Sequence, residues 1–107
     1  MSVEDPSGLW VRCTWEIWEK KITISHPELS ELLGDVSKAI AEPLQINQDK
    51  DYPNRRCYYG MTLVEGALRH LKVVVEYQSG LFRKPAGLII SAHTRVSVSP
   101  GEVQIWP

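Results

Sequence analysis

The second half of the chain alternates apolar and polar residues, and this period of two predicts three β-strands. Successive side chains of a strand point to opposite faces, so alternation is typical of a sheet with one buried face. The three strands are "RRCYYGM" (55–61), "LKVVVEY" (71–77) and "GLIISAH" (87–93). "TLVEGALRH" (62–70) and "QSGLFRKPA" (78–86) are interpreted as connections, the second of them a hairpin loop with glycine and proline. "EVQIW" (102–106) predicts a further edge strand.

The clearest helical period lies in "SHPELSELLGDVSKAIAEP" (25–43). One apolar stripe at three- and four-residue spacing is formed by Leu29, Leu32, Leu33, Val36 and Ile40. Ser25 or His26 can cap this helix, and Pro27 suits its first turn. The polar stretch "NQDKDYPN" (47–54) that follows predicts a loop.

The N-terminal quarter of the chain is less regular. "LWVRCTW" (9–15) alternates and predicts a first strand. "EIWEKKITI" (16–24) has isoleucines and lysines at helical spacing, whereas its "KITIS" portion alternates like a strand. We favour a short helix there. Residues 1–8, which include a proline and a glycine, predict a loose terminus.

This order of elements predicts a single α+β domain over residues 1–107, with its core at about 9–106. One strand and two N-terminal helices would be followed by a small curved, mainly antiparallel sheet. We expect the helices to cover one face of that sheet. The other face would remain open and would carry the functional residues.

Composition and charge narrow the possible functions. Of 107 residues, 43% are hydrophobic and 23% charged, and the formal net charge of −1 does not favour non-specific binding of nucleic acid. "MSVEDPSGLW" lacks a basic region followed by an apolar one, so we expect no secretory signal and a cytoplasmic protein with two reduced thiols, Cys13 and Cys57. No apolar run approaches the roughly 20 residues of a membrane span. Metal-ligand spacings and glycine-rich cofactor motifs are lacking too, so we expect no membrane, metal or cofactor.

The alternation also predicts which side chains share a face of the sheet. The core set is expected to comprise Cys57, Tyr59, Met61, Leu71, Val73, Val75, Tyr77, Leu88, Ile90 and Ala92. The open face would gather Arg56, Tyr58, Lys72 and His93. Cations stabilise a phosphate as charge builds on it, histidine or tyrosine can transfer protons, and tyrosine can stack on a base. These residue types therefore suit RNA cleavage.

A plainer interpretation of the same residues stays open. Cations and tyrosines are common on exposed sheet faces, where they contact only their cross-strand neighbours. His26 stands beside a helix start, a place more typical of a cap or a surface residue than of a catalytic base. His70 borders a strand and is interpreted as structural.

The motifs "HPEL", "AEPLQI", "NRRCYYG", "LKVVVEY" and "GLIISAHT" follow one another over about residues 10–95. In this order they resemble small domains of the barnase–EndoU–colicin–RelE-like (BECR) nuclease superfamily. The likeness is closest to phage and bacterial domains of an "H-P-E … P-x-x-I … R-x-Y-Y … V-V-V … I-I-x-A" type, and "IISAHT" is similar to the closing strand of BrnT-like toxins. The resemblance implies two helices before a curved antiparallel sheet. It also implies metal-independent RNA cleavage by a toxin or phage-associated enzyme.

Together, the face assignment and the resemblance imply roles for individual residues. The catalytic roles fall to His26, Arg56, Tyr58 and His93. The RNA-binding roles fall to Lys21, Arg55, Lys72 and Thr94. Relatives of this type carry a histidine five residues before "HPE", where this chain has Lys21. A lysine can hold a phosphate but is a poorer proton shuttle at neutral pH.

A second hypothesis is a catalytically silent member of the same fold that acts as an interaction module. The chain has four tryptophans, Trp10, Trp15, Trp18 and Trp106. Tryptophan is enriched at binding hot spots, although it also packs in cores. The first hypothesis makes RNA the partner, with a cognate antitoxin if the enzyme is a toxin, and the second makes the partner a second copy of the chain or another protein.

Overall fold

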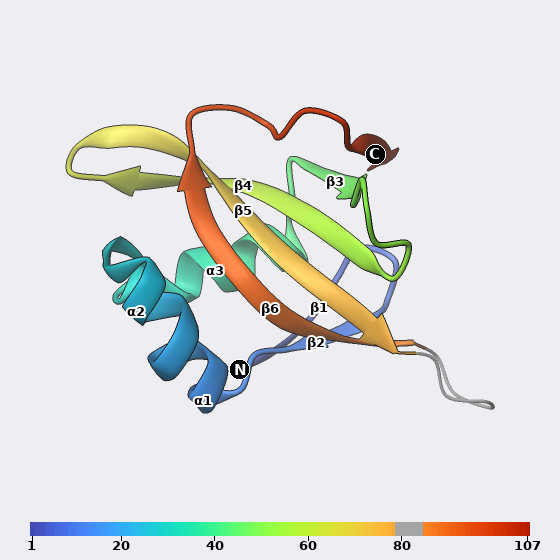
Figure 1. The fold of residues 1–107 in the computed structure, drawn as a ribbon, viewed down its shortest axis with the longest axis horizontal. Coiled ribbons are helices and arrows are strands. Elements are labelled where there is room, and N and C mark those ends of the chain that lie inside the picture. Colours follow the sequence, from blue (N-terminus) through green and yellow to red (C-terminus); the bar gives the residue numbers. More distant parts are fainter. Residues whose placement is uncertain (79–84) are drawn as a thin grey trace.

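The chain folds into a seven-stranded mixed sheet with helices packed against one face (Figure 1). The computed structural model describes residues 1–78 and 85–107, so the loop expected over 78–86 lies largely outside the described residues. The strands are β1 (Ser2–Glu4), β2 (Trp10–Arg12), β3 (Gln45–Gln48), β4 (Arg55–Val64), β5 (Ala67–Gln78), β6 (Ala86–Arg95) and β7 (Val103–Trp106). Their order is β1-β2-β6-β5-β4-β3-β7, with β2 and β6 parallel and the other neighbours antiparallel. The predicted α+β class and the edge strand near the C-terminus are confirmed.

Two helical regions precede the long strands. The helical elements are α1 (Trp15–Ile17), a π-helix (Trp18–Ile22), α2 (Thr23–Ser25), a 3₁₀ helix (Pro27–Leu29) and α3 (Leu33–Ala41). The first three run on without a break, so the preference for a helix over 16–24 is confirmed. Among the described residues, no helix has both the length and the apolar character needed to cross a membrane.

The second helical region differs from the single helix expected over 25–43. Pro27 begins a 3₁₀ turn, in which the backbone N–H of Ser30 donates to the Pro27 carbonyl. Such turns seldom continue for more than three or four residues because their hydrogen-bond geometry is poor. The chain therefore turns before α3 begins. The apolar stripe is kept across the break, since Leu29 and Val36 are both fully buried.

The β4–β5 hairpin is longer than the alternation predicts. The strands continue through residues 62–70 and meet at Glu65 and Gly66, whose φ angles of 49° and 77° are both positive. Two consecutive positive φ angles match the twist of a tight two-residue hairpin turn. Leu63 and Leu68 form an exposed cross-strand pair near this turn. The buried residue at this end of the hairpin is the polar Thr62, so the hydrophobic pattern does not indicate the strands there.

The N-terminal residues are ordered, contrary to the loose terminus expected over 1–8. β1 pairs with β2, and Val3 packs against the core. Asp5 is only 4% exposed, and its carboxylate accepts hydrogen bonds from the Leu9 backbone N–H (2.9 Å) and the Tyr58 hydroxyl (2.7 Å). A three-residue strand held by a polar anchor has almost no hydrophobic period, so the pattern could not indicate it.

The main core lies between the sheet and the helices. Its buried members are Val11, Cys13, Trp18, Ile22, Leu29, Val36, Ala39, Ile40, Ile46, Tyr58, Leu71, Val73, Val75, Ile89 and Ala92. The assignment of Leu71, Val73 and Val75 to the core is confirmed. The helix lies so close to the sheet that a Cβ added at Gly60 would be 3.0 Å from the Cβ of Ala39. This close packing fixes α3 against β4.

The face assignment of β4 is wrong by one residue. Tyr58 pairs with Val73 and is fully buried on the helix side, so Arg56, two residues earlier, also leaves on that side. Cys57 and Tyr59 leave on the opposite side and are buried as well. Because both sides of β4 are covered, the polarity of its residues does not distinguish one face from the other.

The face assignment of β6 is correct at one end and wrong at the other. A register shift opposite Val74 and Val75 interrupts the alternation in β6. Ile89 is fully buried there, whereas Ile90, the expected core residue, is only partly buried. Beyond the shift the expected pattern holds, because Ala92 is buried in the core.

The face of the sheet opposite the helices is not open over β4 and β5, contrary to expectation. β6 and β7 are separated by three strands, so the segment that joins them, residues 96–102, runs from the end of β6 to the other edge of the sheet (Figure 1). Ser99 accepts a hydrogen bond from Lys72, and Glu102 accepts one from Tyr59. This 96–102 segment therefore covers the middle of β4 and β5 on the side that the helices leave free.

Candidate active site

His93, near the end of β6, is the centre of a cluster of ionisable side chains. It is the cross-strand partner of Lys72 in β5, so both side chains leave the same face of the sheet. The imidazole of His26, which follows α2, lies beside it, with ring centroids 5.5 Å apart and 30° between the ring planes. The π-helix packs against β6, and this packing places His26 at the sheet. The structure thus brings together two of the four expected catalytic residues.

Two further residues extend this cluster along the same face. His70 and Arg95 are cross-strand partners two positions along from Lys72 and His93, and a spacing of two keeps all four side chains on one face. The Nδ1 atom of His70 is buried and finds no hydrogen-bond partner among the described residues. Arg95 donates from Nε to the carbonyl of Ser97 at 3.0 Å. Its terminal guanidinium nitrogens remain free to bind an anion, as far as the described residues go.

The surroundings of His93 hold its imidazole in the neutral form. Burial is the main cause that lowers its pKa from the ordinary 6.5 to about 4, and the positive charges of Lys72, His26 and Arg95 lower it further. At pH 7 the ring therefore keeps a nitrogen lone pair that can accept a proton. An anion bound among these cations would oppose their effect and raise the pKa again.

His26 is the more accessible imidazole of the pair. Its side chain is 37% exposed, and its Nδ1 lies 3.5 Å from a carboxylate oxygen of Glu28. A carboxylate beside one ring nitrogen orients the imidazole and leaves the other nitrogen for a reacting group. Two imidazoles in one site can act as a general base and a general acid. The His26–His93 pair has the composition needed for proton transfer at two points of a substrate.

Lys72 anchors the 96–102 segment to the sheet. Its Nζ donates to the carboxylate of Glu102 at 2.6 Å and to the hydroxyl of Ser99 at 2.9 Å. The side chains of Lys72 and Glu102 are only 12% and 3% exposed. Burial acts to lower the pKa of Lys72, but the hydrogen bond to Glu102 outweighs it and keeps the pKa above its ordinary value. The ammonium is charged but already paired, so it is not a free cation for RNA.

Two of the other residues expected to bind RNA lie away from the histidines. Thr94 pairs with Leu71 of the core, so its side chain leaves on the helix side of the sheet. Arg55 donates from Nε to the carboxylate of Glu76 at 3.0 Å, and its guanidinium lies 3.9 Å from the ring centroid of Tyr52. Neither side chain joins the cluster around His93.

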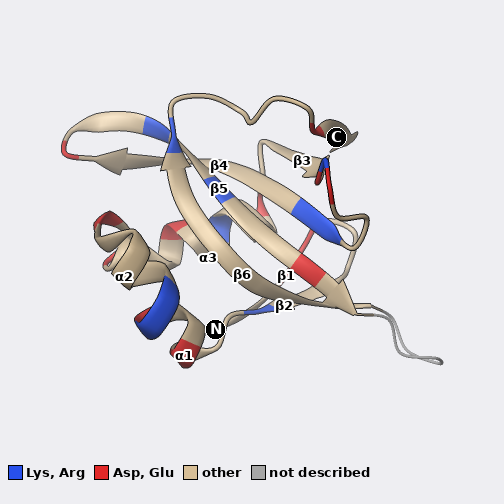
Figure 2. Cartoon of the chain, in the orientation of Figure 1, with Lys and Arg blue, Asp and Glu red and all other residues tan. Residues whose placement is uncertain are grey.

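Lys21 lies in the π-helix and is exposed to solvent. Within residues 1–78 and 85–107 it forms no hydrogen bond or ion pair through its side chain. Figure 2 shows the basic residues in small groups, in the first helical region, at the start of β4 and at the end of β6. Lys21 is therefore an unpaired surface cation of the first helical region, as far as the described residues go.

Arg56 and Tyr58 do not join the cluster, contrary to the expectation of one shared face. Tyr58 is fully buried on the helix side, where its hydroxyl is hydrogen-bonded to Asp5 and to the hydroxyl of Tyr77. Burial, followed by these hydrogen bonds, raises the pKa of Tyr58, so the phenol stays protonated. Arg56 lies 5.3 Å from the ring centroid of Tyr77. Neither residue can act on a substrate bound at His93 on the other side of the sheet.

Arg95 and His70 are members of the cluster that the sequence analysis does not assign to it. A signal for both is present, since His70 precedes Lys72 by two residues and Arg95 follows His93 by two. The period of two that groups Lys72 with His93 also includes them. Arg95 lies just beyond the expected end of its strand, which is why the pattern did not extend to it.

Three potential metal ligands also meet under the 96–102 segment. The Sγ of Cys57 and carboxylate oxygens of Asp49 and Glu102 lie within 4.8 Å of one another. Burial is the main cause that raises the pKa of Cys57 to about 12, and the oxygens of Glu102 accept hydrogen bonds from Lys72 and Tyr59. These groups take part in the hydrogen-bond network that holds this segment: the Cys57 thiol donates to Asp49, and the Glu102 carboxylate accepts from Lys72 and Tyr59.

Comparison of the chain with models of known protein families, with curated proteins and with solved structures finds no match. Function is therefore inferred from the chemistry of the described side chains. Among these, the His26–His93 pair combines a neutral, partly buried imidazole with an accessible one.

The pKa of His93 predicts how stability depends on pH. In the unfolded chain His93 should titrate near 6.5, but in the folded chain its pKa is about 4. Between these values the unfolded state binds the extra proton, so the free energy of unfolding should fall as pH is lowered from 6.5 to 4. Urea unfolding at a series of pH values should show a shallower dependence for His93→Asn. Equal slopes for both proteins would contradict the depressed pKa.

Proposed function

We propose that this protein is a metal-independent endoribonuclease of the RelE-like type within the BECR superfamily, acting on RNA in the cytoplasm. The observation that supports this best is the pairing of His93 with His26, whose ring centroids are 5.5 Å apart. Arg95 supplies a cation beside the pair. RNA provides its own nucleophile, the 2′-OH, so two proton-transfer groups and a cation suffice for cleavage.

In the proposed reaction, His93 accepts the proton of the 2′-OH, and the 2′-oxygen attacks the adjacent phosphorus. The bond between phosphorus and the 5′-oxygen breaks, and protonated His26 donates its proton to that oxygen. Arg95 stabilises the negative charge on the phosphoryl oxygens during the attack. The products are a 2′,3′-cyclic phosphate and a 5′-OH. Water can then open the cyclic phosphate to a 3′-phosphate, with the two histidines exchanging roles.

Substrate binding is expected to increase the basicity of His93. In the free protein its pKa is about 4, in part because of the positive charges of Lys72, His26 and Arg95. A bound phosphate should raise this pKa by about one unit or more, since it lies close to the ring. NMR titration of His93 with and without a non-cleavable 2′-deoxy oligonucleotide would measure the change. An uncharged nucleoside is the matched control, and an unchanged pKa with the oligonucleotide would argue against phosphate binding at this site.

The experiment that tests the proposed function is incubation of the protein with end-labelled single-stranded RNA in EDTA. We expect fragments that end in a 2′,3′-cyclic phosphate or a 3′-phosphate. A 2′-deoxy nucleotide at the cleaved position should block the cut, because it removes the nucleophile. Cleavage that EDTA abolishes, or that occurs at the 2′-deoxy position, would contradict the mechanism. Lys38→Ala, which removes a basic side chain of α3 on the other side of the sheet, is the control variant.

A second function, the silent interaction module, is supported by a different observation. Trp10, Trp15 and Ile24 expose 57%, 63% and 72% of their surface, in β2 and the first helical region. Exposed large apolar side chains often mark protein–protein contacts. This function makes a second copy of the chain or another protein the partner. It predicts no cleavage of RNA and a dimeric mass in light scattering that persists on dilution.

A further inference from the structure

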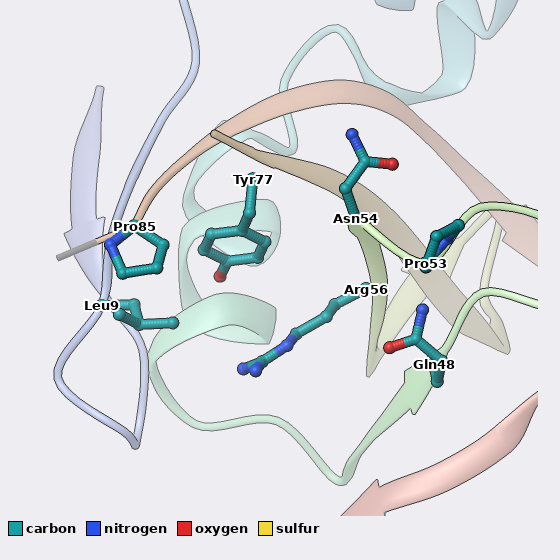
Figure 3. Close-up of a pocket in the computed structure, with 7 residues that line it drawn as sticks. All are labelled: Leu9, Gln48, Pro53, Asn54, Arg56, Tyr77 and Pro85. Atoms are coloured by element: carbon teal, nitrogen blue, oxygen red, sulfur yellow. The ribbon is translucent and has the colours of Figure 1, made fainter. Parts of the chain in front are cut away.

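A pocket of about 360 Å³ opens at the end of the sheet away from the histidines. It is lined by Leu9, Gln48, Pro53, Asn54, Arg56, Tyr77 and Pro85 (Figure 3). These residues come from separate parts of the chain: the turn before β2, the end of β3, the start of β4 with the two residues just before it, and the facing ends of β5 and β6. Its volume falls at the lower end of the range of roughly 300–1,000 Å³ that is typical of small-molecule sites.

Arg56 is the charged group of this pocket. Figure 3 shows its guanidinium and the ring of Tyr77 directed into the same space, with 5.3 Å between the guanidinium carbon and the ring centroid. Among residues 1–78 and 85–107 it has no ion-pair partner. The carboxylate of Asp5 is already held by backbone and hydroxyl donors, and Glu76 is paired with Arg55.

The residues that the structure does not describe offer no carboxylate for this guanidinium either. Residues 79–84 are "SGLFRK" and contain no acidic side chain. A partly buried cation without a counterion is costly, and a bound anion removes that cost. A guanidinium offers two parallel N–H donors, which match the oxygens of a phosphate or carboxylate. The chemistry of Arg56 therefore points to an anionic ligand group.

The remaining walls indicate the other half of the ligand. Leu9, Pro53 and Pro85 present apolar surfaces, and the ring of Tyr77 offers a flat one. Gln48 donates from Nε2 to two backbone carbonyls, those of Tyr52 and Arg55, which fixes its side chain and leaves its carbonyl oxygen as an acceptor. Flat apolar groups stack well against proline and tyrosine. The walls thus suit a flat apolar body rather than a bare ion.

We propose that this pocket binds a small organic anion in which a flat apolar ring carries a phosphate or carboxylate group. Arg56 binds the anionic group, and Tyr77 with the prolines holds the ring. The site is independent of the proposed ribonuclease site, since the side chain of Arg56 lies on the helix side of the sheet and that of His93 lies on the opposite side. Failure of RNA cleavage would not affect it. This activity goes beyond the proposed function.

NMR titration of the full chain with phenyl phosphate, benzoate, benzyl alcohol and inorganic phosphate tests the proposal. Phenyl phosphate or benzoate should shift the amide signals of Gln48, Asn54 and Tyr77 in a saturable manner. Arg56→Met should weaken the binding by about tenfold or more, because it removes the charged donors but keeps the length of the side chain. Arg56→Lys should give an intermediate affinity. Arg55→Met, a change at the neighbouring arginine outside the pocket, should leave it unchanged.

The four probes test separately whether the pocket needs the anionic group and the apolar ring of the ligand. Tighter binding of either aromatic anion than of the other two probes supports it and identifies the preferred anionic group. Benzyl alcohol binding as tightly as the anions would overturn the role of Arg56. Inorganic phosphate binding as tightly as phenyl phosphate would overturn the role of the apolar walls. An affinity that Arg56→Met leaves unchanged, with the melting temperature intact, would also overturn the proposal.

Discussion

Replacement of His93 by asparagine is expected to lower the rate of RNA cleavage by roughly 10²–10⁴-fold, the range of general acid–base catalysis. Asparagine retains a hydrogen-bonding side chain but cannot accept a proton near neutral pH. Gel analysis of labelled RNA under single-turnover conditions would measure the loss. The fold should be retained, because His93 is only partly buried and lies outside the main core. The melting temperature of the variant provides the check.

The pH dependence of cleavage distinguishes the two histidines. A base that must be deprotonated sets the acid limb of the rate profile, and an acid that must be protonated sets the basic limb. Accordingly, His93→Asn should lose the acid limb of its residual activity, and His26→Asn the basic limb. Lys38→Ala should keep both limbs and the full rate. A His93→Asn protein that cleaves as fast as the unaltered chain would overturn the proposed role of His93 as the base.

The strands that the sequence predicts best are those with a single buried face. In β5 the core side chains alternate without interruption through Leu71, Val73 and Val75, and the alternation identifies both the strand and its core face. The hydrophobic pattern does not predict β3 (Gln45–Gln48), and the loop expected over 47–54 overlaps the end of this strand. With four residues and the polar sequence "QINQ", it offers only one strongly apolar position. Its place is fixed by pairing with β4 on one side and, on the other, with β7, which lies far away in the sequence.

β4 shows why the candidate site could be predicted only in part. The 96–102 segment buries Tyr59, so the strand has apolar residues on both sides and its polarity pattern carries no information on orientation. Arg56 is polar yet lies on the core side, because it sits at the strand end where the core gives way to a pocket. Contacts between segments remote in sequence decide both the burial of Tyr59 and the position of Arg56. Periodicity reflects only the local backbone conformation and the burial of one face.

The pairing of His26 with His93 depends on the same kind of long-range contact. Each residue could be selected from its own motif, but nothing in the spacing requires the first helical region to pack beside the end of β6. Lys72 illustrates the reverse case. The sequence indicates a cation on the correct face, but only the fold reveals that Glu102 neutralises it. The residue types of a site can thus be read from sequence, whereas the state of charge requires the packed structure.

Replacement of Glu102 by glutamine is expected to destabilise the protein by roughly 3–5 kcal/mol, because it leaves the charge of Lys72 buried without a partner. The side chains of this pair are only 3% and 12% exposed, and glutamine can still accept hydrogen bonds from Tyr59. For a domain of this size, such a loss corresponds to a fall in Tm of roughly 13–22 °C. Thermal and urea unfolding would measure it. Detachment of the 96–102 segment should accompany the loss and appear as faster amide exchange at Ser99, whose N–H donates to Tyr59.

Two further variants show whether the unpaired charge of Lys72 causes the loss of stability in Glu102→Gln. Lys72→Met combined with Glu102→Gln removes that charge and should recover most of the lost stability, whereas a double variant as unstable as Glu102→Gln would refute this origin. Glu76→Gln, in the Arg55 pair whose side chains are 28% and 30% exposed, should cost no more than about 1 kcal/mol.

The pH dependence of the Glu102 ion pair gives an independent test of the same contact. Burial acts to raise the pKa of Glu102, but hydrogen bonds from Lys72, Tyr59 and Asn47 outweigh it and hold the pKa below its ordinary value of 4.5. The stabilisation is therefore complete above that value and is lost as pH falls through the folded pKa. Glu102→Gln cannot titrate in this range. Its deficit relative to the unaltered chain should shrink in acid, and a deficit that stays constant down to pH values where carboxylates are protonated would show that charge pairing is not what holds the 96–102 segment in place.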